Sequence, residues 1–408
     1  MAKPQIRLKG FEGEWKLSLM SELTTSFSYG INAAAIQYDG IHKYLRITDI
    51  NDSSNEFDQS NLTSPNAEES KLAPFYLKEG DITFARTGAS VGKSYIYNPN
   101  DGNVIFAGFL IRVILKDRVN PFFVYLNTLT KKYRKHVTLV SQRSGQPGMN
   151  PKEFGEFRFY ISPNPKEQRA IGDYFKSLDS MLQSTTKKIE SLKQMKQACL
   201  VSMFPHAGET TPRIRFKGFE GEWKCLPMSE IFIERHDIST ITDNLPQLSF
   251  TIEEGVIRPE DRKTNKRDFL IKDKTNKRYL VTCMDDIIYN PANVIYGAIH
   301  KNSLCDGVVS PIYKIFYTLQ DPSFMECVVR RPEFIKEMTI YMEGTVQKLR
   351  TLKPEAFLKM SAYIAPSLEE QKKIGDYFRS LDKQISLQKQ RLEKLKQIKA
   401  ACLDKMFV

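Results

Sequence analysis

EQRAIGDYFKSLDSMLQSTTKKIESLKQMKQACLVSMF occupies residues 167–204, and the chain repeats this stretch near its end. The second copy, EQKKIGDYFRSLDKQISLQKQRLEKLKQIKAACLDKMF at 370–407, is identical at 20 of 38 positions with an offset of 203. A shorter stretch, IRLKGFEGEWKLSLMSEL at 6–23, returns as IRFKGFEGEWKCLPMSEI at 214–231 with 13 of 18 positions identical. Self-similarity of this kind indicates a chain built from two related halves.

Both copies of the long stretch predict a helix with a coiled-coil seam. Seam positions recur at alternating spacings of four and three, the pattern of two helices that pair through one face. Polar residues interrupt the seam at the same two steps, Thr185 and Lys196 in the first copy and Gln388 and Lys399 in the second. Such interruptions penalise slipped registers, so we expect the two helices to pair with each other. The predicted apolar seam residues are Ile171, Phe175, Leu178, Leu182, Ile189, Leu192, Ile374, Phe378, Leu381, Ile385, Leu392 and Leu395.

The length of the two helices predicts a spacer. At 1.5 Å per residue, a helix of about 37 residues spans roughly 55 Å. Paired antiparallel, the helices would hold one domain near each end, related by an approximate two-fold axis. A DNA duplex presents the same face about every 34–36 Å, so such a spacer could hold two readers on two half-sites. The alternative is that each amphipathic helix packs only on its own domain.

The stretches between the repeats resemble each other only faintly and are rich in short β-like runs bounded by turns. Predicted strands lie at 43–50, 80–88 and 103–115 in the first half and at 277–290 and 308–319 in the second, and predicted helices at 121–136 and 322–338. We therefore predict an α+β fold with two domains of matching topology. The predicted domains are 1–164 and 207–366, and the coiled-coil helices are 165–206 and 367–408.

The stretch ARTGASVGKS, residues 85–94, resembles a phosphate-binding loop. The motif requires glycine five residues before Gly92, where this chain has Thr87, so the spacing misses by one. The corresponding stretch of the second half, DIIYNPANVIYGAI, has no Gly-Lys-Ser. We therefore expect a strand-turn-strand element in both halves, and nucleotide hydrolysis remains an alternative.

Other enzyme motifs are equally incomplete. The tetrapeptide NPAN, 290–293, lacks the second proline and the aromatic residue of the adenine methyltransferase motif, and no glycine-rich S-adenosylmethionine loop follows a strand. Glu370 and Lys372 form an E-x-K at a predicted helix start, where a surface pair is expected. The five histidines and six cysteines show no metal-ligand spacing. We therefore predict no catalytic residue, metal or cofactor in this chain; a self-contained methyltransferase is an alternative.

The charge balance points to a polyanionic partner. The chain has 60 Lys plus Arg against 48 Asp plus Glu, a net charge of +12, which favours nucleic acid or an acidic membrane surface. No run approaches the roughly 18 apolar residues that span a bilayer, and no apolar signal segment starts the sequence. Cysteines without paired spacing fit a reducing compartment, so we expect a cytoplasmic protein.

Basic and amide side chains supply the candidate DNA contacts. Cations would neutralise phosphates, and amide or guanidinium groups on flexible loops suit base edges in a groove. In the first half the candidates are Arg46, Arg86, Thr87, Lys93, Lys131, Lys132 and Arg134, with Gln142, Arg143 and Gln146 as base readers. In the second half they are Lys263, Lys266, Arg267, Lys274, Lys277 and Arg278, with Gln347 and Lys348 as base readers. Solvated loop charge is the alternative for the basic runs.

The segments GDITFARTGASVGK, FAGFLIRV and EQRAIGDYFKSLD, with the doubled GFEGEW and IGDYF, resemble the specificity subunit of type I restriction-modification systems. The resemblance implies two target-recognition domains, each reading one half of a split, asymmetric DNA site. It also implies that the helices bind two methyltransferase subunits and that two restriction/translocase subunits complete an assembly for defence against foreign DNA. S-adenosylmethionine, ATP, Mg and all catalysis would then belong to these partners. The stretch YNPANVIYG departs from the ARTGASVGK form, so residue roles do not transfer between the halves. A basic scaffold for proteins or RNA, without sequence preference, remains a further alternative.

Overall fold

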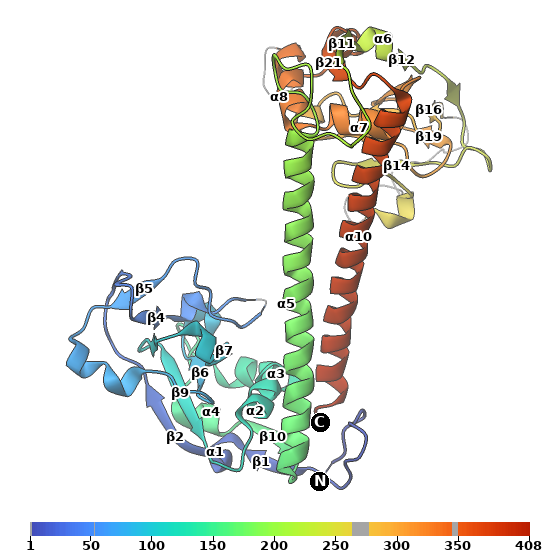
Figure 1. Ribbon diagram of the computed structural model, residues 1–408. Helices are drawn as coiled ribbons and strands as arrows, with labels where there is room; N and C mark the ends of the chain where they lie inside the picture. Colours follow the sequence, from blue (N-terminus) through green and yellow to red (C-terminus); the bar gives the residue numbers. More distant parts are fainter. Residues whose placement is uncertain (1, 53, 263–276, 345–349) are drawn as a thin grey trace. The chain divides into compact units, whose positions relative to one another are not determined.

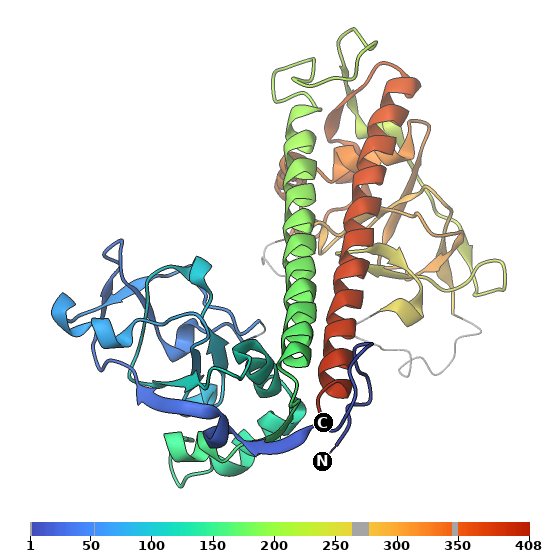
Figure 2. The same cartoon turned by 60° about the horizontal axis from the view of Figure 1, so that its bottom comes forward.

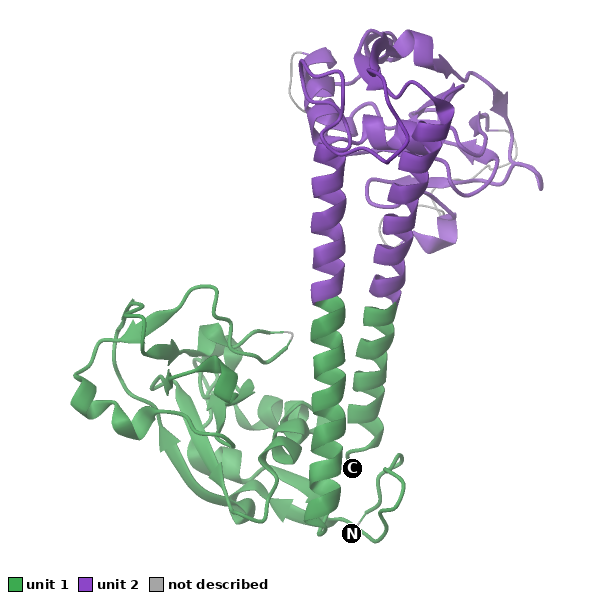
Figure 3. Cartoon of the chain, viewed as in Figure 1, with its two compact units in different colours: residues 1–186, 391–408 green, residues 187–390 purple. Residues whose placement is uncertain are grey.

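The structure is a computed structural model that describes residues 2–52, 54–262, 277–344 and 350–408 (Figure 1). The chain divides into two compact units (Figure 3). Unit 1 comprises residues 1–186 and 391–408, and unit 2 comprises residues 187–390. Each unit mixes helices with strands, and each includes part of both long helices.

A four-stranded antiparallel sheet forms the centre of unit 1, in the order β2-β9-β6-β7. Its strands are β2 (Thr24–Tyr29), β9 (Leu110–Leu115), β6 (Ile82–Ala85) and β7 (Ser94–Ile96). Apolar residues of β6 and β9 pack in one core with helices that follow the sheet in the chain. These helices are α2 (Pro121–Thr128), α3 (Lys131–Val140) and α4 (Pro151–Gly155).

The remaining strands of unit 1 form small sheets of two strands each. β1 (Lys16–Leu19) pairs with β10 (Arg158–Ile161), which leads into the long helix, and α1 (Met20–Leu23) connects β1 to β2. A second apolar core contains Leu45, Phe57, Val104 and Phe106. The strands in and around it are β3 (Ala35–Gln37), β4 (Lys43–Leu45), β5 (Thr63–Pro65) and β8 (Val104–Phe106).

Unit 2 repeats the central sheet with different side chains. The order β12-β20-β17-β18 is again antiparallel and follows the same chain order as in unit 1. These strands are β12 (Phe232–Glu234), β20 (Lys314–Thr318), β17 (Ile287–Tyr289) and β18 (Ile299–Lys301), followed by α7 (Pro322–Val329), α8 (Pro332–Tyr341) and α9 (Pro354–Leu358). The other elements are β11 (Lys224–Pro227), which pairs with β21 (Ser361–Ile364), α6 (Met228–Ile231), β13 (Ile238–Ser239), β14 (Ser249–Thr251), β15 (Gly255–Ile257), β16 (Tyr279–Thr282) and β19 (Gly307–Val309).

Several predicted elements are shorter in the structure because turns and caps interrupt them. The strand predicted at 103–115 divides into β8 and β9 at a turn through Gly108, where Leu110 N–H donates to Ala107 O. The helix predicted at 121–136 divides into α2 and α3 because the Thr130 hydroxyl accepts a hydrogen bond from Tyr133 N–H and starts a new helix. The helix α8 has no side-chain cap and begins instead with Pro332, whose missing N–H leaves no donor unpaired in the first turn. The stretch 277–290 likewise divides into β16 and β17, and 308–319 into β19 and β20.

Two helices of 38 residues each, α5 (Pro165–Ser202) and α10 (Leu368–Lys405), carry the repeated segment (Figure 2). In unit 1, Lys399 Nζ lies 2.5 Å from Asp179 Oδ1, and Tyr174 Oη lies 3.5 Å from Cys402 Sγ. Residue numbers rise along α5 as those of the partners fall along α10, so the helices run antiparallel in this unit.

Unit 2 contains the same pair of contacts at the repeated positions. Lys196 Nζ lies 2.6 Å from Asp382 Oδ1, and Cys199 Sγ lies 3.4 Å from Tyr377 Oη. The helices are therefore antiparallel here too. Of the predicted seam residues, Leu182, Leu392 and Leu395 are half-buried and the other nine are buried. Near the start of α5, the seam also joins the core of its own domain, because Ile171 and Phe175 pack with the sheet and α2.

The short repeat, with its GFEGEW sequence, binds a glutamate at the start of each long helix through an arginine, and this contact is called the clamp. In unit 1 the guanidinium of Arg7 donates two hydrogen bonds to Glu167, from Nε at 2.6 Å and Nη2 at 2.8 Å, and two more to the Glu12 and Gly13 carbonyls. The indole of Trp15 donates to the same carboxylate at 3.2 Å. Because Glu167 lies in the first turn of α5, its negative charge also faces the positive end of the helix dipole.

Unit 2 builds the same ion pair from Arg215 and Glu370, but Trp223 Nε1 has no hydrogen-bond partner among the described residues, unlike Trp15. Nε and Nη2 of Arg215 donate to the two carboxylate oxygens at 2.7 and 2.8 Å, and the guanidinium also reaches the carbonyls of Glu220 and Gly221. Both carboxylates are almost fully buried, with side-chain exposures of 0% for Glu167 and 1% for Glu370. The repeated sequence thus encodes a repeated ion pair that orients each long helix on its own domain.

Candidate nucleic-acid interface

The glycine-rich stretch of unit 1 forms the turn of a β-hairpin. β6 and β7 pair antiparallel, and the turn between them contains the 3-10 helix η4 (Gly88–Ser90). Gly92 has φ of 84°, and a Cβ there would lie 2.6 Å from Val137 Cγ1, so this position requires glycine. A phosphate-binding loop leads from a strand into a helix whose N-terminus holds the phosphates, whereas this loop leads into a second strand. The geometry therefore disfavours the nucleotide-hydrolase alternative.

The equivalent stretch of unit 2 is also a hairpin turn. β17 and β18 pair antiparallel, and the 3-10 helix η8 (Val294–Tyr296) lies between them. Gly297, which aligns with Gly92, has φ of 83°. The predicted strand-turn-strand element is therefore confirmed in both halves.

In unit 1 the backbone brings the two predicted contact loops together. Gly88 N–H donates to Pro147 O at 2.9 Å, and Met149 N–H donates to Arg86 O at 2.8 Å. These bonds place the loop 141–150 beside the hairpin turn. The loop then ends at Asn150, whose side chain accepts a hydrogen bond from Glu153 N–H and starts α4. The side chains of Gln142, Arg143 and Gln146 are exposed on this loop.

Arg86 belongs to this cluster and lies beside two aromatic rings. Its guanidinium carbon lies 5.0 Å from the Tyr29 ring centroid and 5.7 Å from that of Phe109. Its Nε donates to Gly108 O at 3.1 Å. Within the described residues Arg86 makes no ion pair, so its charge is not compensated by a neighbouring carboxylate. Thr87 follows it, half-buried, and forms a backbone bridge to Gly148.

Besides Lys131, three of the other predicted cations are paired with carboxylates inside unit 1. Arg46 donates to both oxygens of Asp49 at 2.9 Å, and Lys93 forms an ion pair with Asp52. Arg143 pairs with Glu153. Such pairs reduce the net charge that these side chains offer to a phosphate. Arg134 is exposed on α3 and forms no ion pair with a described residue.

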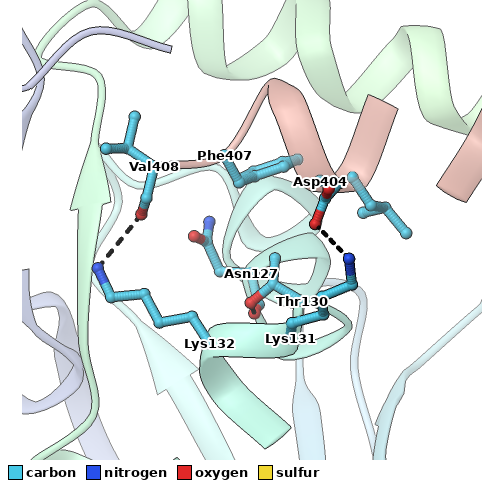
Figure 4. Close-up of a pocket in the computed structure, with 8 residues that line it drawn as sticks. Asn127, Thr130, Lys131, Lys132, Asp404, Phe407 and Val408 are labelled. Carbon is cyan, nitrogen blue, oxygen red and sulfur yellow. Dashed lines mark hydrogen bonds and ion pairs between the residues drawn. The ribbon is translucent and has the colours of Figure 1, made fainter. Parts of the chain in front are cut away.

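Lys131 and Lys132 face the end of the second long helix rather than the two loops. They line a pocket of unit 1 with Asn127, Thr130, Leu403, Asp404, Phe407 and Val408 (Figure 4). Lys131 Nζ lies 2.9 Å from Asp404 Oδ1, while Lys132 donates to Val408 O at 3.2 Å and lies over the Tyr160 ring. Partial burial lowers the pKa of Lys132. Their role as DNA contacts stays a prediction, and the structure assigns them a contact with α10.

Unit 2 places fewer of its predicted contacts. Lys277 and Arg278 are exposed, and Lys277 Nζ lies 5.6 Å from the Tyr279 ring centroid. Leu352 N–H donates to Pro291 O at 3.0 Å. Leu352, which follows the predicted base readers Gln347 and Lys348 in the chain, therefore adjoins the hairpin turn of unit 2. The predicted contacts Lys263, Lys266, Arg267, Lys274, Gln347 and Lys348 lie outside the described residues.

Aromatic residues at the hairpins were missed by the sequence reasoning. Tyr29 and Phe109 in unit 1 and Tyr296 in unit 2 have exposed fractions of 45%, 54% and 67%. Tyr29 and Phe109 are distant in sequence, and only the sheet brings them to Arg86. One signal was available: FAGF at 106–109 contains a glycine between two phenylalanines, which is typical of a tight turn that exposes one of them.

A buried aspartate precedes the equivalent strand in each unit. Asp81 stands before β6 and Asp286 before β17, and burial raises the pKa of both carboxyls. Each also accepts a hydrogen bond from the backbone N–H three residues earlier. Arg112 Nη1 lies 3.7 Å from Asp81, whereas Arg235 donates two hydrogen bonds to Asp286 at 2.8 and 3.0 Å. Both aspartates are engaged in holding the hairpins, which leaves them no role on the exposed face.

The described part of the chain contains no group of three or more His, Cys, Asp or Glu side chains that could hold a metal ion. Among the same residues, none of the helices combines the length and apolar character that a bilayer crossing demands. The chemistry available at the hairpins is therefore that of guanidinium, amide, hydroxyl and aromatic groups.

Residues 31–194 match the family model of the type I restriction modification DNA specificity domain. This part of the chain is similar to the DNA specificity domain of that family. The match includes the hairpin turn and the loop 141–150 of unit 1, and continues into α5. The match supports a role in DNA sequence specificity for this part of the chain.

One solved structure shows that the similarity of the fold extends over the whole chain. The S subunit of a type I restriction-modification system from M. genitalium matches with a TM-score of 0.63 at 14% identity, covering 100% of this chain and 99% of that one. A chain from a study of complex assembly and conformational transition of the type I R-M system matches with a TM-score of 0.49 at 13% identity, covering 98% and 99%. The HsdS subunit from Thermoanaerobacter tengcongensis matches with a TM-score of 0.45 at 14% identity, covering 98% of each chain. No curated protein matches the chain in sequence.

Proposed function

We propose that the chain is a non-catalytic recognition subunit whose two units each read one half of a split, asymmetric DNA site. The single observation that carries this proposal is that the same sheet order presents unlike side chains at equivalent hairpin turns. Arg86 and Thr87 of unit 1 correspond to Pro291 and Ala292 of unit 2 at the offset of 205 that aligns Gly92 with Gly297. A constant scaffold with different contact groups is what two different half-sites require.

The long helices are proposed to form an antiparallel coiled coil that sets the separation of the half-sites, with the two domains related by an approximate two-fold axis. The repeated contacts support this arrangement, because Lys196 with Asp382 and Lys399 with Asp179 are the same pair at positions 203 residues apart. Ion pairs at equivalent positions of two paired helices favour one alignment of the helices over shifted ones.

The outer faces of the helices are proposed to bind two methyltransferase subunits, with two restriction/translocase subunits completing the assembly in the cytoplasm. Several large apolar side chains of α5 and α10 support a protein partner there, since they are exposed by 42–52%. They are Met181, Met195, Leu387 and Ile398. S-adenosylmethionine, ATP and Mg would be bound by those partners, which would methylate, translocate and cleave DNA.

Mapping of methylated adenines across the host genome, with and without this chain, tests the proposal. We expect a split motif that is methylated only when the chain is present. An unchanged methylation map would contradict the proposal. Methyl transfer or ATP hydrolysis by the purified chain alone would favour the enzyme alternatives, and equal competition by all duplex sequences would favour the scaffold without sequence preference.

Removing one heptad from each helix tests the spacer. Deletion of 183–189 together with 386–392 removes the polar steps Thr185 and Gln388 and leaves both Lys–Asp pairs in place. The spacer shortens by about 10 Å, so the gap between the half-sites should shrink by about three base pairs while their sequences stay the same. An unchanged gap would show that the helices do not set it. Deleting 183–189 alone is the matched control, because it breaks the register and should abolish methylation.

A further inference from the structure

Arg86 is held rigidly at the end of the unit 1 sheet. Its backbone N–H donates to Phe109 O at 3.0 Å, and its carbonyl accepts from Met149 N–H at 2.8 Å. The side chain is fixed as well, because Nε donates to Gly108 O at 3.1 Å. Only the two Nη groups have no hydrogen-bond partner among the described residues. Four N–H donors on one plane are thus available to a ligand.

The two rings beside Arg86 adjoin turns that contain glycine, Gly30 after Tyr29 and Gly108 before Phe109. Phe109 follows a turn in which Gly108 N–H donates to Ile31 O at 2.8 Å. Across the turn, a Cβ on Gly30 would lie 2.2 Å from Ala107 O, so Gly30 permits the close approach that brings Tyr29 beside Phe109. Tyr29 and Phe109 remain about half exposed, at 45% and 54%. Large aromatic surface left open beside a cation indicates a contact surface rather than a core.

The chemistry of this cluster differs from that of a phosphate contact. A phosphate can be bound by a mobile side chain, by lysine as a point charge or by arginine through two donors. A guanine edge instead takes two parallel N–H donors from one guanidinium onto O6 and N7, which demands a fixed plane. Arg86 has its plane held by the Nε hydrogen bond and by two neighbouring rings, and it lacks the carboxylate partner that Arg46, Lys93 and Arg143 have.

We infer that Arg86 is a base-reading residue of the first half-site, donating from both Nη groups to a guanine in the major groove. Tyr29 and Phe109 are positioning residues that hold its plane. This inference rests on the proposed function and deepens it, because it assigns one base of the target to one side chain. In unit 2 the equivalent position is Pro291, which has no donor, so the contact belongs to one half-site only.

A binding selection tests this inference. The complex that assembles on the tagged full-length chain in its host cells is purified and allowed to bind 40-base-pair duplexes with a randomised centre. For the unaltered chain we expect a split motif with a guanine at one position of the first half. Arg86→Lys keeps the charge but loses the paired donors, so preference for that guanine should fall by roughly ten- to hundredfold. All other positions should keep their preference.

Variants of the rings separate positioning from folding. Tyr29→Leu and Phe109→Leu should weaken the same single position, while Tyr29→Phe and Phe109→Tyr, which keep a ring, should restore it. Arg213→Lys is the matched control and should change nothing, because Arg213 is exposed and pairs with Glu209. Retention of the second half of the motif shows that each variant is folded.

The outcomes distinguish the inference from the function on which it rests. If Arg86→Lys binds with an unaltered motif, Arg86 contacts a phosphate or nothing, and the inference is wrong while the proposed function stands. If ring-conserving variants lose the position as fully as the leucine variants, the rings do not act by positioning. If the unaltered complex selects no motif, the proposed function itself fails.

Discussion

The clamps at the starts of the long helices and the turns of the two hairpins show opposite relations between the units. Both clamps place a guanidinium, of Arg7 or Arg215, on a buried glutamate and two carbonyls. The indole bond of Trp15 to Glu167 has no counterpart among the described residues of unit 2. The hairpin turns share their strand pairing and a glycine of positive φ, yet one presents Arg86 and the other Pro291. The two units therefore have the same residues where each orients a long helix, and different residues where each would contact a ligand.

The largest expected effect is at the clamps, and it tests whether they are equivalent. Arg7→Ala and Arg215→Ala each leave a buried glutamate without its cation, so each should lower the free energy of unfolding by about 3–5 kcal/mol. Urea unfolding of the full chain measures this. Lys71→Ala is the control, because the exposed pair of Lys71 with Glu68 should contribute less than about 1 kcal/mol. A large loss for only one of the two arginines would break the equivalence.

The paired glycines of the hairpin turns should respond unequally to the same substitution. Both have positive φ, so alanine strains each backbone by about 1–2 kcal/mol. At Gly92 the added Cβ also meets both methyl groups of Val137, at 2.6 and 2.7 Å, which adds about 1–3 kcal/mol, whereas at Gly297 nothing lies within 4 Å. Thermal unfolding of Gly92→Ala and Gly297→Ala should therefore rank the first as clearly less stable. Equal losses would mean that α3 does not pack on this turn.

A smaller and equal effect is expected from the two helix ion pairs. Lys196 with Asp382 and Lys399 with Asp179 are partly exposed, so double-mutant cycles should give coupling free energies of about 0.2–1 kcal/mol for each. The substitutions are lysine to methionine and aspartate to asparagine. Coupling free energies that differ by more than about 1 kcal/mol would show that the two ion pairs stabilise the helices unequally.

The smallest expected effect is on pH dependence and sharpens the comparison of the hairpins. Burial raises the folded-state pKa of Asp81 above the unfolded value of about 3.9, so its contribution to stability is present below that pH and is lost as the pH rises through the folded-state pKa. Asp81→Asn should lose less stability than the unaltered chain as the pH rises from about 4. Urea unfolding at a series of pH values measures the difference.

Asp58→Asn provides a control of opposite sign. Hydrogen bonds from Ser60 lower the pKa of the Asp58 carboxyl, so its contribution is present above the unfolded-state value and is lost as the pH falls. Removing that carboxyl should therefore leave the behaviour above pH 4 unchanged. If Asp58→Asn and Asp81→Asn shift the profile in the same direction, burial of Asp81 is not the cause.

The sequence predicted those parts of the fold whose signal is long and periodic. The seam pattern extends along most of each copy, and both copies form helices of 38 residues. Breaks that depend on one side chain were missed, as at Thr130, where a single hydroxyl ends one helix and starts another. A residue of that kind caps a helix only when the chain turns there, which a propensity does not specify.

The candidate site was predicted as two loops but not as a cluster. Arg86 and the loop 141–150 were identified from their chemistry, and the structure shows that they adjoin through backbone hydrogen bonds. The roles of Tyr29 and Phe109 depend on a sheet that joins β2, β6 and β9, which no local pattern reveals. Lys131 and Lys132 were chosen for charge alone, and the contact of these residues with the end of α10 requires knowledge of the fold.

The composition of unit 1 has a consequence for synthesis on the ribosome. Residues 391–408 complete its core with Met406 and Phe407, whereas unit 2 is one continuous stretch, 187–390. A nascent chain that has emerged as far as residue 390 contains all of unit 2, whereas unit 1 still lacks the core residues Met406 and Phe407. The half that is translated first is the last to mature, the reverse of the usual vectorial order.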